Sequence, residues 1–160
     1  MAIKVGDKMP AGTLTLVTAD GPQKISAEDY FKGKKVVLFS LPGAFTPTCD
    51  AKHLPGFVQK AAELRAKGVD TIACISVNDA FVMKAWGKAQ GVEGKVDMLA
   101  DGNADYTKAM GLEFDASGFG MGTRGQRFAV VVDNGVIKNL NVEGKGEFKV
   151  SSAEYVLEQL

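Results

Sequence analysis

The chain has 160 residues, of which 46% are hydrophobic, so one apolar core can hold it together without a disulfide or a structural metal. Its 19 basic and 19 acidic side chains cancel, which excludes the strong net charge of proteins that bind nucleic acids or anionic membranes electrostatically. No stretch has the roughly 20 apolar residues of a membrane-spanning helix or the apolar centre of a signal peptide, so we expect one cytoplasmic domain over residues 1–160.

The amino-terminal part predicts a hairpin, a short helix and a buried strand. Alternating residues around the turn at 18–21 favour the hairpin. Ser26 stands where a helix cap is expected, ahead of a brief helix that ends near Gly33. The continuous apolar run at 36–40 is typical of a central strand that is covered on both faces.

The next segment predicts a helix followed by a second strand. Between residues 46 and 67, apolar side chains recur at intervals of three and four, which favours a helix that ends at Gly68. Pro55 should kink this helix, because proline lacks a backbone N–H and crowds the previous turn. The β-branched segment 69–77 should then form a strand parallel to the first, joined to it by a right-handed crossover.

Helices and strands are expected to keep alternating through the middle of the chain. Asn78-Asp79 can cap a helix that runs to Gly91, and Asp101 can cap another that ends at Gly111. Residues 96–99 should form a short strand between them. This order of elements predicts an α/β fold.

The carboxyl-terminal part predicts a second hairpin and a final helix. Asn134-Gly135 separates strands at 128–133 and 136–142, and both turn residues tolerate the positive φ that a hairpin needs. This antiparallel pair would complete a central mixed sheet flanked by helices. The segment Ser151-Ser152-Ala153-Glu154 has capping-box spacing, so the chain should end in a helix. Residues 115–125 include four glycines and should form a mobile or interface-forming loop.

The segment between the buried strand and the first long helix contains the residues with the clearest chemistry. If Thr46 is the N-cap, Pro47 takes the first helical position and Cys49 the third, so the Cys49 N–H can donate to the Thr46 hydroxyl. The sulfur then lies beside unpaired backbone donors and the positive end of the helix dipole, which favours thiolate over thiol. Cys49 is therefore a candidate nucleophile. The alternative is a small packing residue, although its polar neighbours Thr48 and Asp50 argue against that.

The spacing Pro42-x-x-x-Thr46-x-x-Cys49 resembles the active-site signature of the peroxiredoxins, and the full segment 42–49 resembles their plant type II and mammalian type five subgroup. Other segments are similar to that subgroup in kind and order, namely 53–57, 73–81 and Arg127-Phe128 before a valine-rich strand. The resemblance covers nearly the whole chain. It implies a thioredoxin-like fold and a thiol peroxidase that reduces hydrogen peroxide and alkyl hydroperoxides in antioxidant defence.

The resemblance also implies a role for each matched residue. Cys49 would attack the terminal peroxide oxygen and become a sulfenic acid. Thr46 would hydrogen-bond the peroxide, Pro42 would shield the sulfur from solvent, and the backbone N–H groups of Thr48 and Cys49 would orient the substrate. Arg127 would hold the thiolate and polarise the departing oxygen. From its position alone, Arg127 would be an ordinary surface residue at the end of a strand.

Two further residues have competing interpretations. Cys74 lies in an apolar strand and is either a buried, inert thiol or a resolving thiol that condenses with oxidised Cys49. Mammalian type five members place a resolving cysteine near the carboxyl terminus, where this chain has none, so that mechanism is not carried over. His53 is expected to be structural or to line the pocket: a Cys–His dyad lacks a third, orienting group, and one histidine with two separated cysteines does not supply the closed ligand set of a zinc site.

Several large apolar residues can be interpreted in two ways. On residue type alone, the core would include Phe45, Phe81, Trp86, Phe119 and Met121. In the proteins of the resembled subgroup, aromatic loops near the active site form a homodimer contact. Phe45, Phe81, Phe119 and Met121 are therefore also candidate dimer contacts.

The resemblance implies hydroperoxide substrates and glutathione, glutaredoxin or thioredoxin as the reductant, with no cofactor or metal and with no nucleic-acid or membrane partner. The residues do not choose among these reductants. Two other functions remain open. A disulfide oxidoreductase would normally need Cys-x-x-Cys, whereas Lys52 stands three residues after Cys49. A non-enzymatic chaperone or interaction module could retain the same fold.

Overall fold

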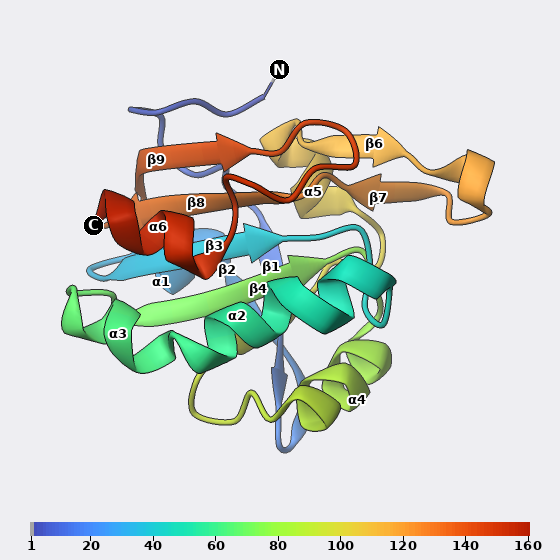
Figure 1. Ribbon diagram of the computed structural model, residues 1–160, viewed down its shortest axis with the longest axis horizontal. Helices are drawn as coiled ribbons and strands as arrows, with labels where there is room; N and C mark the ends of the chain where they lie inside the picture. Colours follow the sequence, from blue (N-terminus) through green and yellow to red (C-terminus); the bar gives the residue numbers. More distant parts are fainter. Residues whose placement is uncertain (1) are drawn as a thin grey trace.

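The computed structural model describes residues 2–160 and has a seven-stranded mixed sheet at its centre (Figure 1). The strand order is β2-β1-β5-β4-β3-β8-β9. The strands of this sheet are β1 (Thr13–Thr18), β2 (Gly21–Ser26), β3 (Lys35–Ser40), β4 (Thr71–Ser76), β5 (Asp97–Ala100), β8 (Phe128–Asp133) and β9 (Val136–Val142). A second, two-stranded sheet pairs β6 (Glu113–Asp115) with β7 (Thr123–Gly125).

Helices cover both faces of the large sheet and enclose two apolar clusters. One face packs against the segment η1 (Cys49–His53) and the helices α2 (Leu54–Gln59), α3 (Ala61–Ala66), α4 (Ala80–Gln90) and α6 (Ala153–Gln159). The other face packs against α1 (Ala27–Phe31) and α5 (Asp105–Met110). The predicted α/β fold, with helices flanking a central mixed sheet, is confirmed.

The central position of β3 in the sheet explains why its sequence is continuously apolar. It lies between β4, which is parallel to it, and β8, which is antiparallel. Val37 and Phe39 join one apolar cluster while Val36 and Leu38 join the other. A strand that is buried on both faces has no position left for a solvated side chain.

The predicted hairpins and several caps are confirmed. β1 and β2 pair antiparallel across the turn at 18–21, and β8 and β9 pair across Asn134 and Gly135, both at positive φ. Ser26 accepts the N–H of Asp29 at the start of α1. Asp79 accepts the N–H of Val82 at the start of α4, which ends at Gly91 with φ +67°.

The helix expected over 46–67 is interrupted. Residues 47 and 48 are helical, η1 is a π-helical turn in which the Leu54 N–H donates to the Cys49 carbonyl, and α2 and α3 follow with a break at Lys60. The π turn ends at His53, two residues before Pro55, which cannot donate to the carbonyl four residues before it, so the wider turn precedes the proline. The expected kink at Pro55 is therefore a change of helix type.

Two other helix starts differ from the prediction. α5 begins four residues after Asp101, so Asp101 is not the N-cap residue itself. Its carboxylate nevertheless accepts the N–H groups of Tyr106 and Thr107 in the first turn of α5. The cap of α6 is Ser152, which accepts the Tyr155 N–H, so Ser151 does not form the expected capping box. Sequence spacing alone could not tell which of two adjacent serines faces the helix.

The glycine-rich segment 115–125 is more regular than expected. Its ends form part of the β6–β7 ladder, and the short helix η2 (Ser117–Phe119) lies between the two strands. This hairpin extends past one end of the large sheet (Figure 1). Over residues 2–160, the helices are too short or too polar to span a membrane.

Candidate active site

Cys49 lies at the carboxyl end of β3, where the chain leaves the sheet and turns into η1. Its side chain is fully buried and belongs to the apolar cluster on the α2 and α4 face. The loop before it is held by Asn78, whose Oδ1 accepts the Ala44 N–H at 2.9 Å and the Ser76 hydroxyl at 2.6 Å. From the sequence, Asn78 was expected only at a helix cap, because no local pattern relates it to Ala44.

Thr46 closes the loop rather than capping the helix with its side chain. Its hydroxyl donates to the Gly43 carbonyl at 2.6 Å, and its own carbonyl accepts the Asp50 N–H at 2.8 Å. The expected bond from the Cys49 N–H to the Thr46 hydroxyl is therefore wrong, because the tight turn between Gly43 and Thr46 draws the hydroxyl away; Phe45 stands in this turn at φ +62°. Within residues 2–160, the Thr48 and Cys49 amides donate to no capping side chain or loop carbonyl.

Arg127 lies next to the sulfur although it is 78 residues away in sequence. It immediately precedes β8, the antiparallel neighbour of β3, and its Nη2 donates to Cys49 Sγ at 3.2 Å. Its Nη1 lies 2.8 Å from His53 Nδ1, and its guanidinium carbon lies 5.7 Å from the centre of the Phe148 ring. A fixed positive charge therefore faces a buried sulfur, an arrangement that stabilises the thiolate form.

His53 holds this guanidinium in place. Its Nε2 lies 2.9 Å from the Ser151 carbonyl, which can only accept, so Nε2 bears the proton and Nδ1 accepts from Arg127. Burial, together with the charge of Arg127, lowers the pKa of His53 to about 3, so the ring is neutral at neutral pH. Both ring nitrogens are occupied by groups other than Cys49, and the structural interpretation of His53 is the one that fits. Its contact with Arg127 was missed, because sequence spacing relates His53 only to Cys49.

A pocket of about 810 Å³ opens beside these groups. Its lining includes Pro42, Thr48, Phe114, Phe119, Arg127 and Phe148. Pro42 is half-buried at this pocket, and its carbonyl accepts from Arg124 Nη1 at 3.3 Å. Arg124 also donates to the Met121 carbonyl at 2.9 Å, so it joins the glycine-rich segment to the active-site loop. The sequence analysis did not single out Arg124.

A second polar cluster fastens the Cys49 turn to α4. Trp86 Nε1 and Gln90 Nε2 both donate to Asp50 Oδ1 at 2.8 Å, and Gln90 Nε2 also reaches the Asp50 carbonyl at 3.1 Å. The residue after Cys49 is thus tied to the helix that follows β4. This tie keeps the π turn, and with it the sulfur, at the end of the sheet.

Cys74 lies in β4 within the same apolar cluster as Cys49, and both are free thiols. Burial raises the pKa of Cys74 well above its ordinary value; the charge of Cys49 acts in the same direction, and Arg127 opposes both. Cys74 is fully buried, as expected for a thiol in an apolar strand. Its role as a resolving thiol stays a prediction.

The aromatic candidates divide between surface and core. Phe45, Phe81 and Phe119 are 54%, 77% and 78% exposed, so their assignment to the core is wrong. They stand in loops or at the start of a helix, where no sheet or helix face covers them. Trp86 is fully buried, as expected, and Met121 is half-buried.

The chain is similar over nearly its whole length to proteins of one family. The family model described as Redoxin matches residues 4–157. Chloroplastic peroxiredoxin-2E-2 of Oryza sativa subsp. japonica is 52% identical over 163 residues, which cover 99% of this chain and 72% of the rice protein. Peroxiredoxin-2D of Arabidopsis thaliana is 50% identical over 159 residues, which cover 99% of this chain and 98% of the Arabidopsis protein. Reduced Prx3 of Vibrio vulnificus in complex with H2O2 has a TM-score of 0.94 and 53% identity, with 98% of each chain covered.

Proposed function

The chain belongs to the peroxiredoxins and is a thiol-dependent peroxidase, and on that premise we propose that Cys49 is the nucleophile that attacks the peroxide. The observation that carries the proposal is the 3.2 Å contact between Arg127 Nη2 and the buried Cys49 Sγ. In the described part of the chain, residues 2–160, no arginine hydrogen-bonds to Cys74, and burial raises the pKa of its thiol well above the ordinary value. Cys49 is therefore the thiol that faces a fixed positive charge.

The proposed reaction moves two electron pairs among three atoms in line, the sulfur and the two peroxide oxygens. The Cys49 thiolate attacks the terminal oxygen of a hydroperoxide, an S–O bond forms, and the O–O bond breaks. The leaving oxygen takes the electron pair and, after it gains a proton, departs as water or an alcohol. Cys49 remains as a sulfenic acid.

The groups around Cys49 match the charge that moves in this step. Negative charge leaves the sulfur and develops on the departing oxygen, so fixed donors must serve both atoms. Arg127 supplies a fixed cation, and the Thr48 and Cys49 amides supply donors at the start of the helix. Thr46 would turn its hydroxyl to the peroxide while its backbone holds the turn, and Pro42 would exclude water.

We further propose that a small thiol or a redoxin reduces the sulfenic acid. The candidates are glutathione, glutaredoxin and thioredoxin. The pocket of about 810 Å³ leaves room beside Cys49 for the organic part of a hydroperoxide or for a thiol reductant. Cys74 is buried in β4, which favours a cycle that uses Cys49 alone, and two free thiols suit a reducing compartment such as the cytoplasm.

A homodimer is the assembly that the exposed aromatic side chains support. Phe45 and Phe119 lie in segments that the active-site loop and the β6–β7 hairpin present to solvent, and Phe81 lies at the start of α4. Large apolar side chains in such positions often mark a contact surface. Sedimentation of the wild type and of a Phe81→Ser variant at micromolar concentration tests this; a wild type that stays monomeric would contradict the proposal.

Intact mass after one equivalent of hydrogen peroxide tests the one-cysteine cycle. We expect the mass of the protein to increase by one oxygen, or by glutathione when that thiol is present. Loss of two hydrogens would instead mean a disulfide between Cys49 and Cys74, and it would contradict the one-cysteine cycle. A Cys74→Ser variant provides the control, because it cannot form that bond.

A further inference from the structure

We propose that Glu143 is a positioning residue for the peroxidase reaction: its carboxylate shapes the segment 144–151, which holds His53 and through it the Arg127 guanidinium at Cys49. This inference rests on the proposed role of Arg127 and goes beyond it. Within residues 2–160, the hydrogen bonds of the Glu143 carboxylate go to residues 149–151 and not to Cys49, although Glu143 also lines the pocket of about 810 Å³. It acts indirectly, because it fixes the main chain of the segment that holds His53.

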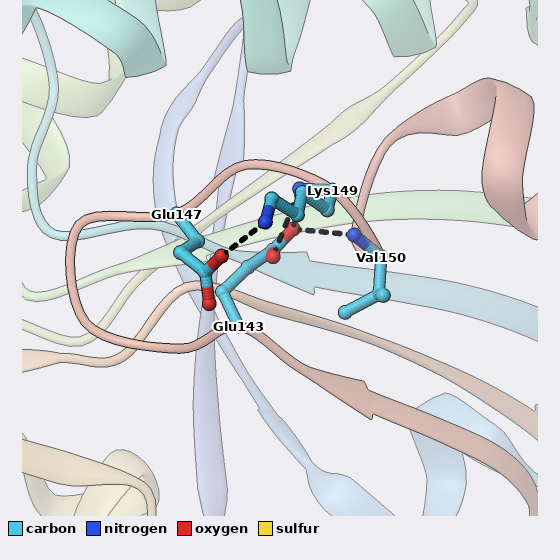
Figure 2. Close-up of polar contacts among 4 residues, drawn as sticks. All are labelled: Glu143, Glu147, Lys149 and Val150. Carbon is cyan, nitrogen blue, oxygen red and sulfur yellow. Dashed lines mark hydrogen bonds and ion pairs between the residues drawn. The ribbon is translucent and has the colours of Figure 1, made fainter.

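The Glu143 carboxylate, at the start of this segment, accepts several hydrogen bonds from the end of the segment. It accepts the backbone N–H groups of Lys149, Val150 and Ser151 at 2.8 to 2.9 Å. It also accepts the Ser151 hydroxyl at 2.6 Å. Figure 2 shows the Glu143 carboxylate directed at the backbone of Lys149 and Val150, whereas Glu147 reaches the Lys149 ammonium. Glu143 thus binds the main chain, and Glu147 binds a solvated side chain.

The closed segment delivers two contacts to the active site. The Ser151 carbonyl accepts from His53 Nε2 at 2.9 Å, and the Phe148 ring lies 5.0 Å from the His53 ring, centre to centre. Phe148 also lies under the Arg127 guanidinium. His53 Nδ1 then accepts from Arg127 Nη1, which leaves Nη2 for the sulfur. Since the acceptor for His53 is a main-chain carbonyl, its position depends on how the segment is folded.

Glu143 is also fixed to Arg127 through the backbone. The Glu143 N–H donates to the Arg127 carbonyl at 2.9 Å, where the chain continues beyond the β8–β9 ladder. The carboxylate that orders the segment and the guanidinium that faces Cys49 therefore start from two hydrogen-bonded residues. A shift of the segment relative to Arg127 would move the Ser151 carbonyl and the Phe148 ring together.

The charge of the carboxylate suits this task. Burial raises the pKa of Glu143, but the hydrogen bonds from Ser151, Lys149 and Val150 outweigh burial and hold that pKa below its usual range. The group is therefore an acceptor with two equivalent oxygens at neutral pH. An amide with its oxygen in the place of Oε2 would set its NH2 group against the Lys149 N–H and would accept the remaining hydrogen bonds without a negative charge, so each of them would be weaker.

The test uses Glu143→Gln and follows the first reaction, the oxidation of Cys49 by hydrogen peroxide in a rapid-mixing experiment. We expect this rate constant to fall by about tenfold, the change produced by a lost hydrogen bond to a charged group. Glu154→Gln is the matched control, because Glu154 is exposed at the start of α6, and it should change the rate by less than about twofold.

A double variant separates positioning from a general loss of structure. If Glu143 acts through Arg127, Glu143→Gln should slow the reaction of an Arg127→Lys protein by less than about twofold. An equal slowing in both backgrounds would overturn the proposal, as would an unchanged rate in Glu143→Gln alone. If Arg127→Lys itself reacts as fast as the wild type, the proposed function of Arg127 fails instead.

Ser151→Ala covers the case in which Glu143→Gln does not fold. It removes only the hydroxyl donor to Glu143 and keeps the main-chain carbonyl that His53 needs. We expect a smaller slowing, about threefold, that also disappears in the Arg127→Lys background. A threefold slowing that persists there would contradict the role given to this segment.

Discussion

Cys49 and Cys74 are both fully buried in one apolar cluster, yet their surroundings differ in kind. Cys49 stands at the start of a helix with an arginine 3.2 Å from its sulfur. Cys74 stands in the middle of β4, paired on both sides by β3 and β5. Burial raises the pKa of Cys74 well above its ordinary value, while Cys49 receives a guanidinium and unpaired amides.

This contrast shows that burial by itself does not decide whether a thiol is inert. A buried thiolate is costly unless charge or hydrogen bonds replace the water that it loses. The strand offers Cys74 no such group, because its backbone donors are used by the ladder. The helix start offers Cys49 backbone donors that no carbonyl within residues 2–160 accepts, together with the cation of Arg127, which immediately precedes β8.

The largest expected effect on peroxide reduction comes from replacing the sulfur of Cys49. Cys49→Ser should lose peroxide reduction completely, because a serine hydroxyl stays protonated and is a poor nucleophile. Cys74→Ser should oxidise at Cys49 within about threefold of the wild-type rate, since Cys74 does not touch the reacting atoms. Stopped-flow oxidation by hydrogen peroxide measures both variants. Fast peroxide consumption by Cys49→Ser would place the reaction at another residue.

The second prediction concerns the accessibility of the strand thiol. In a Cys49→Ser background, iodoacetamide should modify Cys74 at least about a hundredfold more slowly in the native protein than in urea. Burial removes both the thiolate form and the access that alkylation requires. Mass spectrometry over time follows the reaction. Similar rates in the two conditions would show that β4 opens readily, and they would revive the interpretation of Cys74 as a resolving thiol.

The third prediction removes the cation that distinguishes the two thiols. Arg127→Ala should keep the fold and slow oxidation of Cys49 by at least about tenfold, because the variant lacks the donor to the sulfur. Arg65→Ala is the control, since Arg65 is exposed and, over residues 2–160, its hydrogen bonds go to the Gly94 and Lys95 carbonyls, away from Cys49. Equal rates for the two variants would refute the role proposed for Arg127.

The last prediction concerns stability rather than rate and comes from His53. Its pKa is about 3 in the folded protein and about 6.5 when unfolded, so the unfolded chain takes up a proton that the folded protein resists. The stability that the neutral ring contributes is present above pH 6.5 and is lost as the pH falls from there to about 3.

His53→Gln provides the comparison for that window. Glutamine keeps one donor and one acceptor but does not titrate. The free energy of unfolding of the wild type should fall more steeply than that of His53→Gln, by up to about 1.4 kcal/mol per pH unit. Urea unfolding at several pH values between 3.5 and 6.5 measures the difference. Parallel slopes would show that His53 titrates alike in both states.

Local patterns in the sequence determined most of the elements. The turn residues at Asn134 and Gly135, the cap at Asp79 and the apolar run of β3 each depend on neighbours within a few residues, so the sequence alone identified them. It was less reliable where two nearby residues offered the same chemistry, as at Ser151 and Ser152. There the choice depends on a contact with Glu143, eight residues away from Ser151.

The sequence by itself determined that a cysteine stands at a helix start after a buried strand, because an apolar run, a proline at the first helical position and the spacing between them specify that arrangement locally. Only the tertiary structure decided what faces the sulfur. Arg127 reaches Cys49 because β8 pairs with β3, and His53 meets Ser151 because the chain returns from β9 across the active-site turn. Such contacts join residues 74 to 98 positions apart, and no local propensity records them.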